Sequence, residues 1–199
     1  MLEKRPGKRS APYHHGDLRD ALIRAARMIL EKKGLAALSL RGVARVAKVS
    51  PAAPYHHFAD KQALLDAVAA QGFDALRSAM AKRMAKKTDP NTRLEASGVD
   101  YVVFAIENPA LFRLMFGGPE QELSANASLK EARDRAYGVL QAAVAATSPD
   151  GAANPLVCLR LWALVHGIAK LILEGCVRPA DYGLTSGEAL TAHLLRGGQ

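Results

Sequence analysis

Apolar side chains recur along this 199-residue chain at intervals of three and four, the spacing that gathers them on one face of an α-helix. No segment of four to eight residues alternates apolar and polar positions, and no Asn-Gly or Asp-Gly hairpin turn occurs. β-Branched residues are sparse, whereas Ala and Leu are plentiful. The pattern predicts an all-α fold.

The first predicted helix carries its apolar face from Leu18 to Leu30 and ends before Gly34. Ser39 is placed to cap a second helix over about residues 40–47, and Ser50 a third that reaches about Phe58. Only residues 48–49 separate the two short helices. Two short helices joined so tightly after a longer one describe a helix-turn-helix.

Asp60 is placed to cap a long helix whose apolar pattern ends at the charged residues 82–87. This charged stretch before Asp89-Pro90 is the expected domain boundary. The second half of the chain predicts further helices, separated by Gly- and Pro-containing breaks, near residues 92–107, 109–116, 127–146, 155–175 and 185–196.

The charge of the chain is unevenly distributed. Of the formal net charge of +8, residues 1–90 contribute +10 and residues 91–199 contribute −2. Such asymmetry suggests a nucleic-acid or membrane contact by the N-terminal part. Residues 1–14 are expected to form a basic, flexible arm whose cations either follow a DNA duplex into a minor groove or only solubilise the chain: Lys4, Arg5, Lys8 and Arg9.

Two sequence segments resemble the DNA-binding head of the TetR/AcrR family of transcriptional repressors. They are YHHGDLRDALIRAARMILEKKG at 13–34 and LSLRGVARVAKVSPAAPYHHFADKQALLDAV at 38–68. Farther along, ENPALFRLMFG at 107–117 and LWALVHG at 161–167 resemble the effector domain of one subgroup, marked by Trp162, His166 and Gly167. The resemblance implies a three-helix helix-turn-helix head joined to a C-terminal helical bundle, in an Ω-shaped homodimer. The expected domains are 15–76 for DNA binding and 77–199 for effector binding and dimerisation.

The sequence departs from the family pattern at two positions in the head. Lys48 occupies the turn where the family usually has Gly, so the turn either adapts or strains a non-Gly residue. Pro54 stands where many members carry Leu, and it removes the amide that would bond back to the Ser50 carbonyl. We expect an irregular start to the third helix.

The N-terminal part of a recognition helix faces base edges in the major groove. Ala52 or Ala53 would meet a thymine methyl group, and His56 a base or a phosphate. The resemblance implies phosphate contacts for Tyr55 and Lys61, and Arg41 is either a further phosphate contact or a solvated side chain. The predicted DNA-binding set is Arg41, Lys48, Ser50, Ala52, Ala53, Tyr55, His56 and Lys61.

A group of aromatic, Met, Leu and His side chains falls in the region that encloses the effector in relatives. An apolar wall with a few polar groups suits a hydrophobic small molecule, although any one of these residues could equally be ordinary core. His166 is either a hydrogen-bond partner of the ligand or an internally satisfied histidine. The predicted effector-binding set is Tyr101, Phe104, Leu111, Phe112, Met115, Phe116, Trp162 and His166.

The segment 155–175 is apolar almost all round, so one face is expected to pack on its own domain and the other on a second chain. Its partner, by the family pattern, is the last helix. The alternative is a helix wholly covered within one subunit. The predicted dimer interface comprises Leu164, Ile168, Leu171, Leu190 and Leu194.

Other sites lack support in the sequence. The pairs His14-His15 and His56-His57 have no third donor at ligand spacing, so no metal or other cofactor is expected. No Walker loop, Gly-x-Ser-x-Gly elbow or dinucleotide fingerprint occurs. With Arg160, His166 and Lys170 inside it, the segment 155–173 is expected to fall short of a membrane span. Cys158 and Cys176 are expected to be core thiols in the cytoplasm.

Three functions from different classes therefore compete. The leading one is a homodimeric regulator, most simply a repressor, released from a palindromic double-stranded operator by a small apolar effector. The second is a ligand-independent architectural DNA-binding protein, which a cavity filled by its own side chains would favour. The third is a helical enzyme, which would require convergence of titratable groups such as Glu107, Arg113 and His166. We expect no enzymatic activity.

Overall fold

The computed structural model describes residues 15–117 and 126–197. The predicted basic arm, residues 1–14, and the predicted break at Gly118-Pro119 lie outside the described residues. Throughout the part of the chain that the structure describes, regular structure is helical and no strand occurs. The all-α prediction is confirmed.

The N-terminal head is built from α1 (His15–Lys33), a 3-10 turn (Leu35–Ala37), α2 (Leu40–Ala47) and a second 3-10 turn (Ala53–His56). The Ser39 side chain caps α2 as predicted, accepting the Gly42 amide at 3.1 Å. Large apolar side chains of the head are buried in a hydrophobic core that continues into the C-terminal part: Leu22, Ile23, Leu30, Leu38, Val43 and Phe58.

The predicted third helix, from Ser50 to about Phe58, is a single turn of 3-10 helix instead. Ser50 does not cap it through its side chain. Its carbonyl accepts the Ala53 amide at 3.0 Å, a bond three residues apart, because Pro54 has no amide for the bond four residues apart. The Pro54 ring is buried, so the turn is fixed against the core of the head.

Lys48 ends α2 in the left-handed conformation, with φ 58° and ψ 41°. Its amide donates to the carbonyls of Ala44 and Arg45, which closes the end of the helix. The turn therefore keeps the geometry for which glycine is favoured and places a lysine in it, at a cost in backbone energy.

Lys48→Gly should raise the free energy of unfolding by about 0.5–1 kcal/mol, because glycine adopts this conformation without a clash of its Cβ. Lys48→Ala is the matched control, since it removes the charge and keeps the strain. Thermal unfolding of both variants tests this expectation. An alanine variant as stabilised as the glycine variant would mean that the charge, not the backbone, sets the effect.

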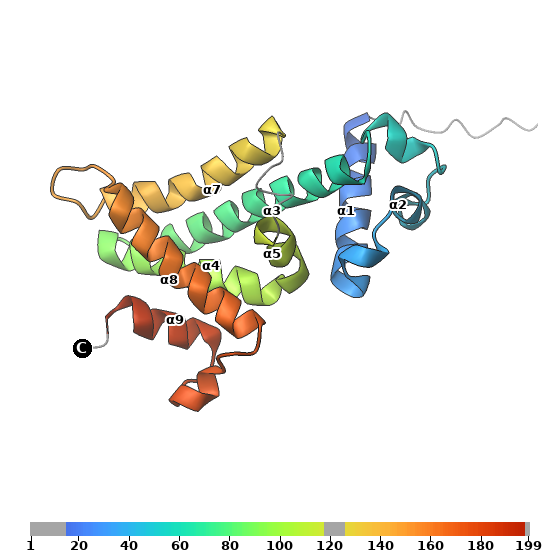
Figure 1. The fold of residues 1–199 in the computed structure, drawn as a ribbon. Coiled ribbons are helices and arrows are strands. Elements are labelled where there is room, and N and C mark those ends of the chain that lie inside the picture. The colour runs from blue at the N-terminus through green and yellow to red at the C-terminus, as the bar shows by residue number, and fades with distance from the viewer. Residues whose placement is uncertain (1–14, 118–125, 198–199) are drawn as a thin grey trace, which may run out of the picture.

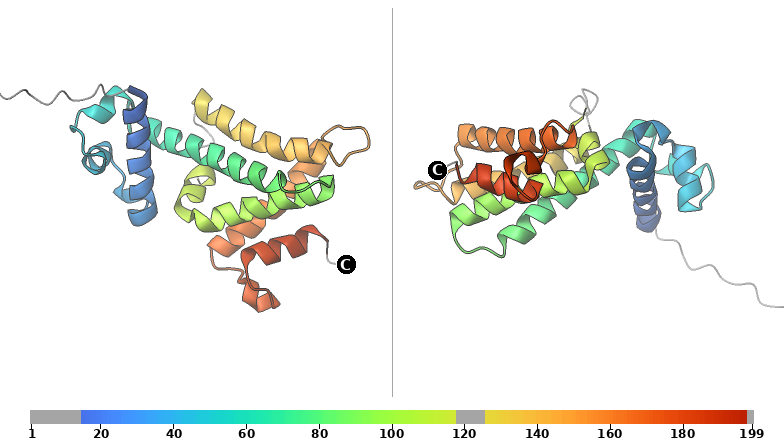
Figure 2. Two further views of the ribbon diagram at one scale, coloured as in Figure 1. Left: turned by 180° about the vertical axis from the view of Figure 1, so that it is seen from behind. Right: turned by 90° about the horizontal axis from the view of Figure 1, so that it is seen from below.

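Helix α3 (Lys61–Met84) begins in the head and continues into the C-terminal body, and the two views of Figure 2 show it as the bridge between them. Asp60 caps it as predicted, accepting the Ala63 amide at 2.7 Å. It passes residue 76, where the expected DNA-binding domain ends, without a break, and it ends at Met84 within the charged stretch 82–87 that the sequence predicts as the boundary. The body adds α4 (Pro90–Glu107), α5 (Pro109–Phe116), α7 (Ala127–Ala145), α8 (Pro155–Leu173) and α9 (Gly187–Leu195), with α3, α4 and α7 packed on one another and α8 and α9 on α4 (Figure 1).

Two expectations about α8 and its surroundings need correction. Among the described residues, α8 is the one helix long and apolar enough to cross a membrane. Its Leu, Val and Ile side chains outweigh its three polar side chains. A single such helix is weak evidence for a membrane span, and 22% of its apolar window is buried in this chain. Cys158 is buried as expected, whereas Cys176, in the turn after α8, is exposed.

Candidate functional site

The predicted DNA-reading residues lie on the outside of the head. Arg41 projects from α2, and Tyr55 and His56 project from the 3-10 turn around the buried Pro54. Tyr55 is 53% exposed, although it is a large aromatic side chain. Ala53 is half-buried, and the others of the set are exposed: Arg41, Lys48, Ser50, Ala52, Tyr55, His56 and Lys61.

The 3-10 turn is held in place by contacts on either side. Phe58 is buried behind it, with the Arg19 guanidinium 5.5 Å from the centre of its ring. Lys61, at the start of α3, donates from Nζ to the Leu35 carbonyl at 3.3 Å. The exposed face is thus carried on a packed scaffold.

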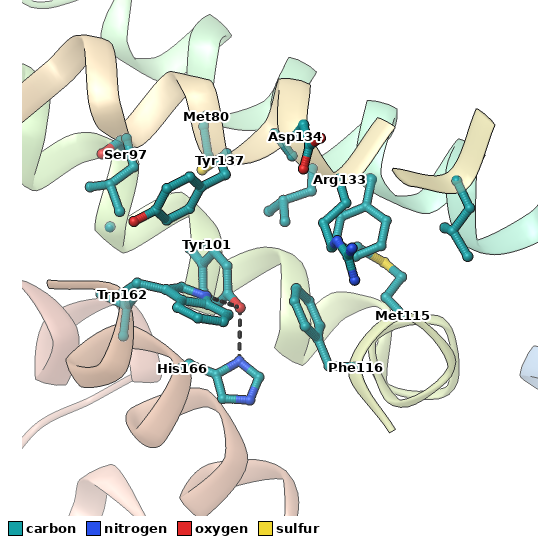
Figure 3. A pocket seen from close by; sticks show the side chains of 17 residues that line it. Met80, Ser97, Tyr101, Met115, Phe116, Arg133, Asp134, Tyr137, Trp162 and His166 are labelled. Atoms are coloured by element: carbon teal, nitrogen blue, oxygen red, sulfur yellow. Dashed lines mark hydrogen bonds between the residues drawn. The ribbon is translucent and has the colours of Figure 1, made fainter. Parts of the chain in front are cut away.

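A cavity of about 410 Å³ lies in the body, within the range of about 300–1,000 Å³ usual for small-molecule sites. Side chains from five helices line it, and Figure 3 shows them converging on the cavity. The lining comes from α3, α4, α5, α7 and α8: Phe73, Leu76, Met80, Ser97, Gly98, Tyr101, Met115, Phe116, Leu129, Arg133, Asp134, Ala136, Tyr137, Leu140, Trp162, Val165 and His166.

Three polar groups in the cavity wall form a chain of hydrogen bonds. Trp162 donates from Nε1 to the Tyr101 hydroxyl oxygen at 3.3 Å, and that hydroxyl lies 2.8 Å from His166 Nδ1 (Figure 3). Since the Trp162 indole can only donate, the Tyr101 oxygen is the acceptor of that bond, and the Tyr101 hydroxyl donates its own proton to His166 Nδ1. In this order Nδ1 is the acceptor, and the imidazole proton is on Nε2.

Burial keeps this chain uncharged. Desolvation raises the pKa of Tyr101 well above its ordinary value, although the bond from Trp162 opposes the shift. Burial, and next the positive charge of Lys170, lower the pKa of His166. At neutral pH the wall therefore presents a phenol and a neutral imidazole.

Acidification should destabilise the protein through His166. Because its folded pKa lies below the unfolded value, the unfolded chain binds more protons, and stability is lost as the pH falls through 6.5 toward the folded pKa. The melting temperature should fall between pH 7.5 and 5.5, and fall less in His166→Gln. An equal fall of the melting temperature in the parent and in His166→Gln would mean that another titrating group causes the loss of stability.

Five of the eight predicted effector residues line the cavity: Tyr101, Met115, Phe116, Trp162 and His166. Phe104, Leu111 and Phe112 do not: all three are almost wholly buried, and Phe104 borders a separate groove between α3 and α4. Phe112 supports the wall, with its ring edge-to-face against Tyr101 at 5.7 Å. Helical periodicity marks all eight as inward-facing, but only packing decides which of them border an empty volume.

The sequence-based prediction missed two walls of the cavity. From α3 come Phe73, Leu76 and Met80, and from α7 come Arg133 and Tyr137 among others. The pattern on α7 carried a usable signal. Leu129, Arg133, Ala136, Tyr137 and Leu140 fall at helical spacing, which places an arginine in the middle of an otherwise mostly apolar face.

The structure divides the predicted dimer residues into two groups. Leu164, Leu171 and Leu194 are exposed in the single chain, at 36, 45 and 41%. Ile168 and Leu190 are buried, at 6 and 5%, because they face the chain's own core, and are not available to a second copy. The exposed apolar face of α8 also includes Leu156 and Leu159.

A polar contact joins the head to the body beside the cavity. Arg27 on α1 donates from Nη2 to Asn108 Oδ1 at 2.6 Å, and Asn108 donates from Nδ2 to the Phe104 carbonyl at 2.9 Å. Asn108 lies directly before α5, whose Met115 and Phe116 line the cavity. A displacement of α5 would therefore be transmitted to α1 through this contact.

The groups considered for an enzyme do not converge. Glu107 borders a different groove, between α3 and α4, whereas His166 lines the cavity. Arg113 is exposed and donates to the Leu173 carbonyl at 3.0 Å. Among the described residues, no group of three or more His, Cys, Asp or Glu is placed to hold a metal ion.

A small helical head with a capped α2, a tight turn and a bridge into a helical body defines the class of helix-turn-helix DNA-binding regulators. Residues 22–68 match the family described as bacterial regulatory proteins of the tetR family, and residues 94–195 match the tetracyclin repressor-like C-terminal domain. The chain belongs to the TetR family of transcriptional regulators. These are DNA-binding regulators, not enzymes.

Solved structures agree with this fold. A Rhodococcus sp. RHA1 protein of unknown function is 32% identical, with a TM-score of 0.75 over 94% of this chain and 96% of that one. A TetR family regulator from Marinobacter aquaeolei VT8 is 20% identical, with a TM-score of 0.63 over 90% and 94% of the two chains. The fatty acid degradation regulator FadR from Bacillus halodurans is 15% identical, with a TM-score of 0.68 over 96% and 98%. No curated protein matches the chain.

Proposed function

We propose that this TetR-family protein is a homodimeric, cytoplasmic repressor that leaves its operator when a small apolar effector enters the cavity. Residues 15–76 would bind DNA, and residues 77–199 would bind the effector and hold the dimer together. The set Arg41, Lys48, Ser50, Ala52, Ala53, Tyr55, His56 and Lys61 would contact the duplex. The effector would lie against the cavity wall, of which Tyr101, Met115, Phe116, Trp162 and His166 are part.

The observation that carries the proposal is the route from the cavity to the reading surface. Helix α3 starts at Lys61 in the head and contributes Phe73 to the cavity twelve residues later, about 18 Å along the helix axis. The bond between Arg27 and Asn108 ties α1 to the neighbouring α5. A ligand that prefers one placement of these helices would shift the placement of the head, and coupling of this kind amounts to about 1–3 kcal/mol.

Dimerisation would follow from the exposed face of α8 and the adjoining Leu194. A second copy of the same face covers these side chains by two-fold symmetry, as in most homodimers. Two heads would then meet two half-sites in successive major grooves, about 34–36 Å apart or a multiple of that.

The alternative is a ligand-independent architectural DNA-binding protein. It would be favoured by a body filled with its own side chains. The cavity of about 410 Å³ argues for the ligand-responsive function, because its size and its largely apolar lining with a few polar groups are those of small-molecule sites.

The proposal is tested with a panel of hydrophobic metabolites and drugs on the purified protein and its genomic DNA fragments. We expect a compound that raises the melting temperature and loosens DNA, because a ligand that prefers one folded state must do at least one of these. Trp162→Ala removes a large part of the wall and should change effector affinity more than DNA affinity, with unfolding measured beside both to detect core damage. A panel without either effect would refute effector control.

A further inference from the structure

The cavity wall is mostly apolar, and it carries two charged side chains that differ in whether they have a partner. The ionised side chains that border it are Arg133 and Asp134, neighbours on α7. Asp134 is paired with Lys130, one turn earlier on the same helix, at 3.1 Å. Arg133 forms no ion pair or hydrogen bond with any residue in the described part of the chain.

The direction of the Arg133 side chain adds to this contrast. In Figure 3 it extends from α7 into the space between α7 and α5, with its guanidinium above Phe116. Tyr137, from the next turn of α7, faces Trp162, and their rings lie edge-to-face at 6.1 Å. The wall thus carries an aromatic pair, Tyr137 and Trp162, and, toward Phe116, a cation that has no partner among the described residues.

We propose that the cavity takes an apolar carboxylic acid, with its carboxylate on Arg133 and its apolar body along the aromatic wall. This inference rests on the proposed effector function and names the chemical class of the effector. A guanidinium presents paired N–H donors that match the two oxygens of a carboxylate. Arg133, which has no partner within residues 15–117 and 126–197, balances one negative charge, so a monoanion fits the site better than a phosphate dianion.

The donors of Trp162 and Tyr101 are already used within the wall. The Tyr101 hydroxyl and His166 Nδ1 are already joined to each other and to Trp162. Asp134 repels a carboxylate, but Lys130 offsets that charge, which leaves Arg133 as the excess charge at the rim. A cationic ligand would have to displace Lys130 from Asp134 and lie close to Arg133.

The chain has one tryptophan, and it lies in the cavity wall. Its fluorescence therefore reports directly on occupancy of this site. Decanoate, decan-1-ol and decylamine share one apolar chain and differ in charge at neutral pH. Titrating each into the intact protein measures the contribution of the charge to the dissociation constant.

Decanoate should bind at least about tenfold more tightly than decan-1-ol, and decylamine more weakly than either. Arg133→Met should bring the dissociation constant of decanoate up to that of decan-1-ol, and Arg133→Lys should fall between, because an ammonium keeps the charge without the paired geometry. Arg135→Met is the matched control: it removes the same charge two residues away, where the guanidinium binds Asp74 on α3 instead of bordering the cavity.

Three results would overturn the acid assignment: decan-1-ol or decylamine binding as tightly as decanoate, no binding by any of the three, or decanoate affinity unchanged in Arg133→Met. The proposed repressor function is tested separately by adding decanoate to the DNA complex. Arg133-dependent binding that leaves DNA affinity unaltered would support the acid site and refute release by this ligand. Release of DNA by other compounds, with no binding of decanoate, would support the repressor function and refute the acid site.

Discussion

Replacing Lys61 with alanine should weaken binding to every duplex and reduce its dependence on salt. A lysine that contacts phosphate releases condensed counterions, so its loss should lower the slope of log K against log salt by about 0.9 for each subunit bound. Tyr55→Phe should lower affinity by about 1.5–3 kcal/mol per subunit without that change of slope, because it removes a neutral donor to a charged phosphate. Both side chains are exposed, but Lys61 also bonds to the Leu35 carbonyl, so thermal unfolding of each variant is measured beside DNA binding to separate a lost phosphate contact from a loosened head.

His56→Ala should have a different signature if His56 contacts a base. Discrimination at one base pair should relax by about 1–3 kcal/mol, while binding to unrelated DNA stays the same. Arg93→Ala, an exposed cation on α4 in the body, is the control for a general loss of charge. If Lys61, Tyr55 and His56 variants bind like the parent across a salt series, the reading surface is elsewhere.

A charge at Leu164 should separate the dimer into single chains. Leu164 is already 36% exposed in one chain, so Leu164→Glu costs the fold of that chain little. In the proposed interface the same carboxylate would be desolvated without a partner, at a cost of several kcal/mol. Light scattering should then report 21.3 kDa in place of twice that mass, and operator affinity should fall because two half-sites are no longer joined.

The matched control is Met28→Glu, at a side chain of α1 that is 47% exposed in the head. It introduces the same charge in place of a similar apolar group and should leave the mass unchanged. A parent protein that already scatters as a single chain, or a Leu164→Glu protein that remains dimeric, would contradict the proposed interface.

Local signals in the sequence predicted most of the fold. The caps Ser39 and Asp60 begin α2 and α3 where expected, because a cap bonds to an amide two or three residues away and needs no tertiary information. The third helix was the failure. Pro54 was recognised as a disturbance, but the ring both removes a helical bond and packs into the core, and together these leave one 3-10 turn.

The candidate cavity was predicted only in part, because a cavity depends on where helices fail to touch. Aromatic residues near α5 and α8 are evident as a group in the sequence, whereas Arg133 was not among the predicted residues, although it lies at helical spacing among apolar positions of α7. The burial of Ile168 and Leu190 has the same origin. An all-round apolar helix does not reveal which side its own domain covers, and the rotation of α8 against α4 decides it.

The central claim, that a two-headed dimer reads a palindromic operator through residues 38–61, is tested most directly by the stoichiometry and footprint of the complex. Genomic fragments selected by the purified protein supply the duplex. We expect two chains on each site, protecting two inverted half-sites whose centres lie about 34–36 Å or a multiple apart. One chain per site, or uniform coverage of any sequence, would contradict it.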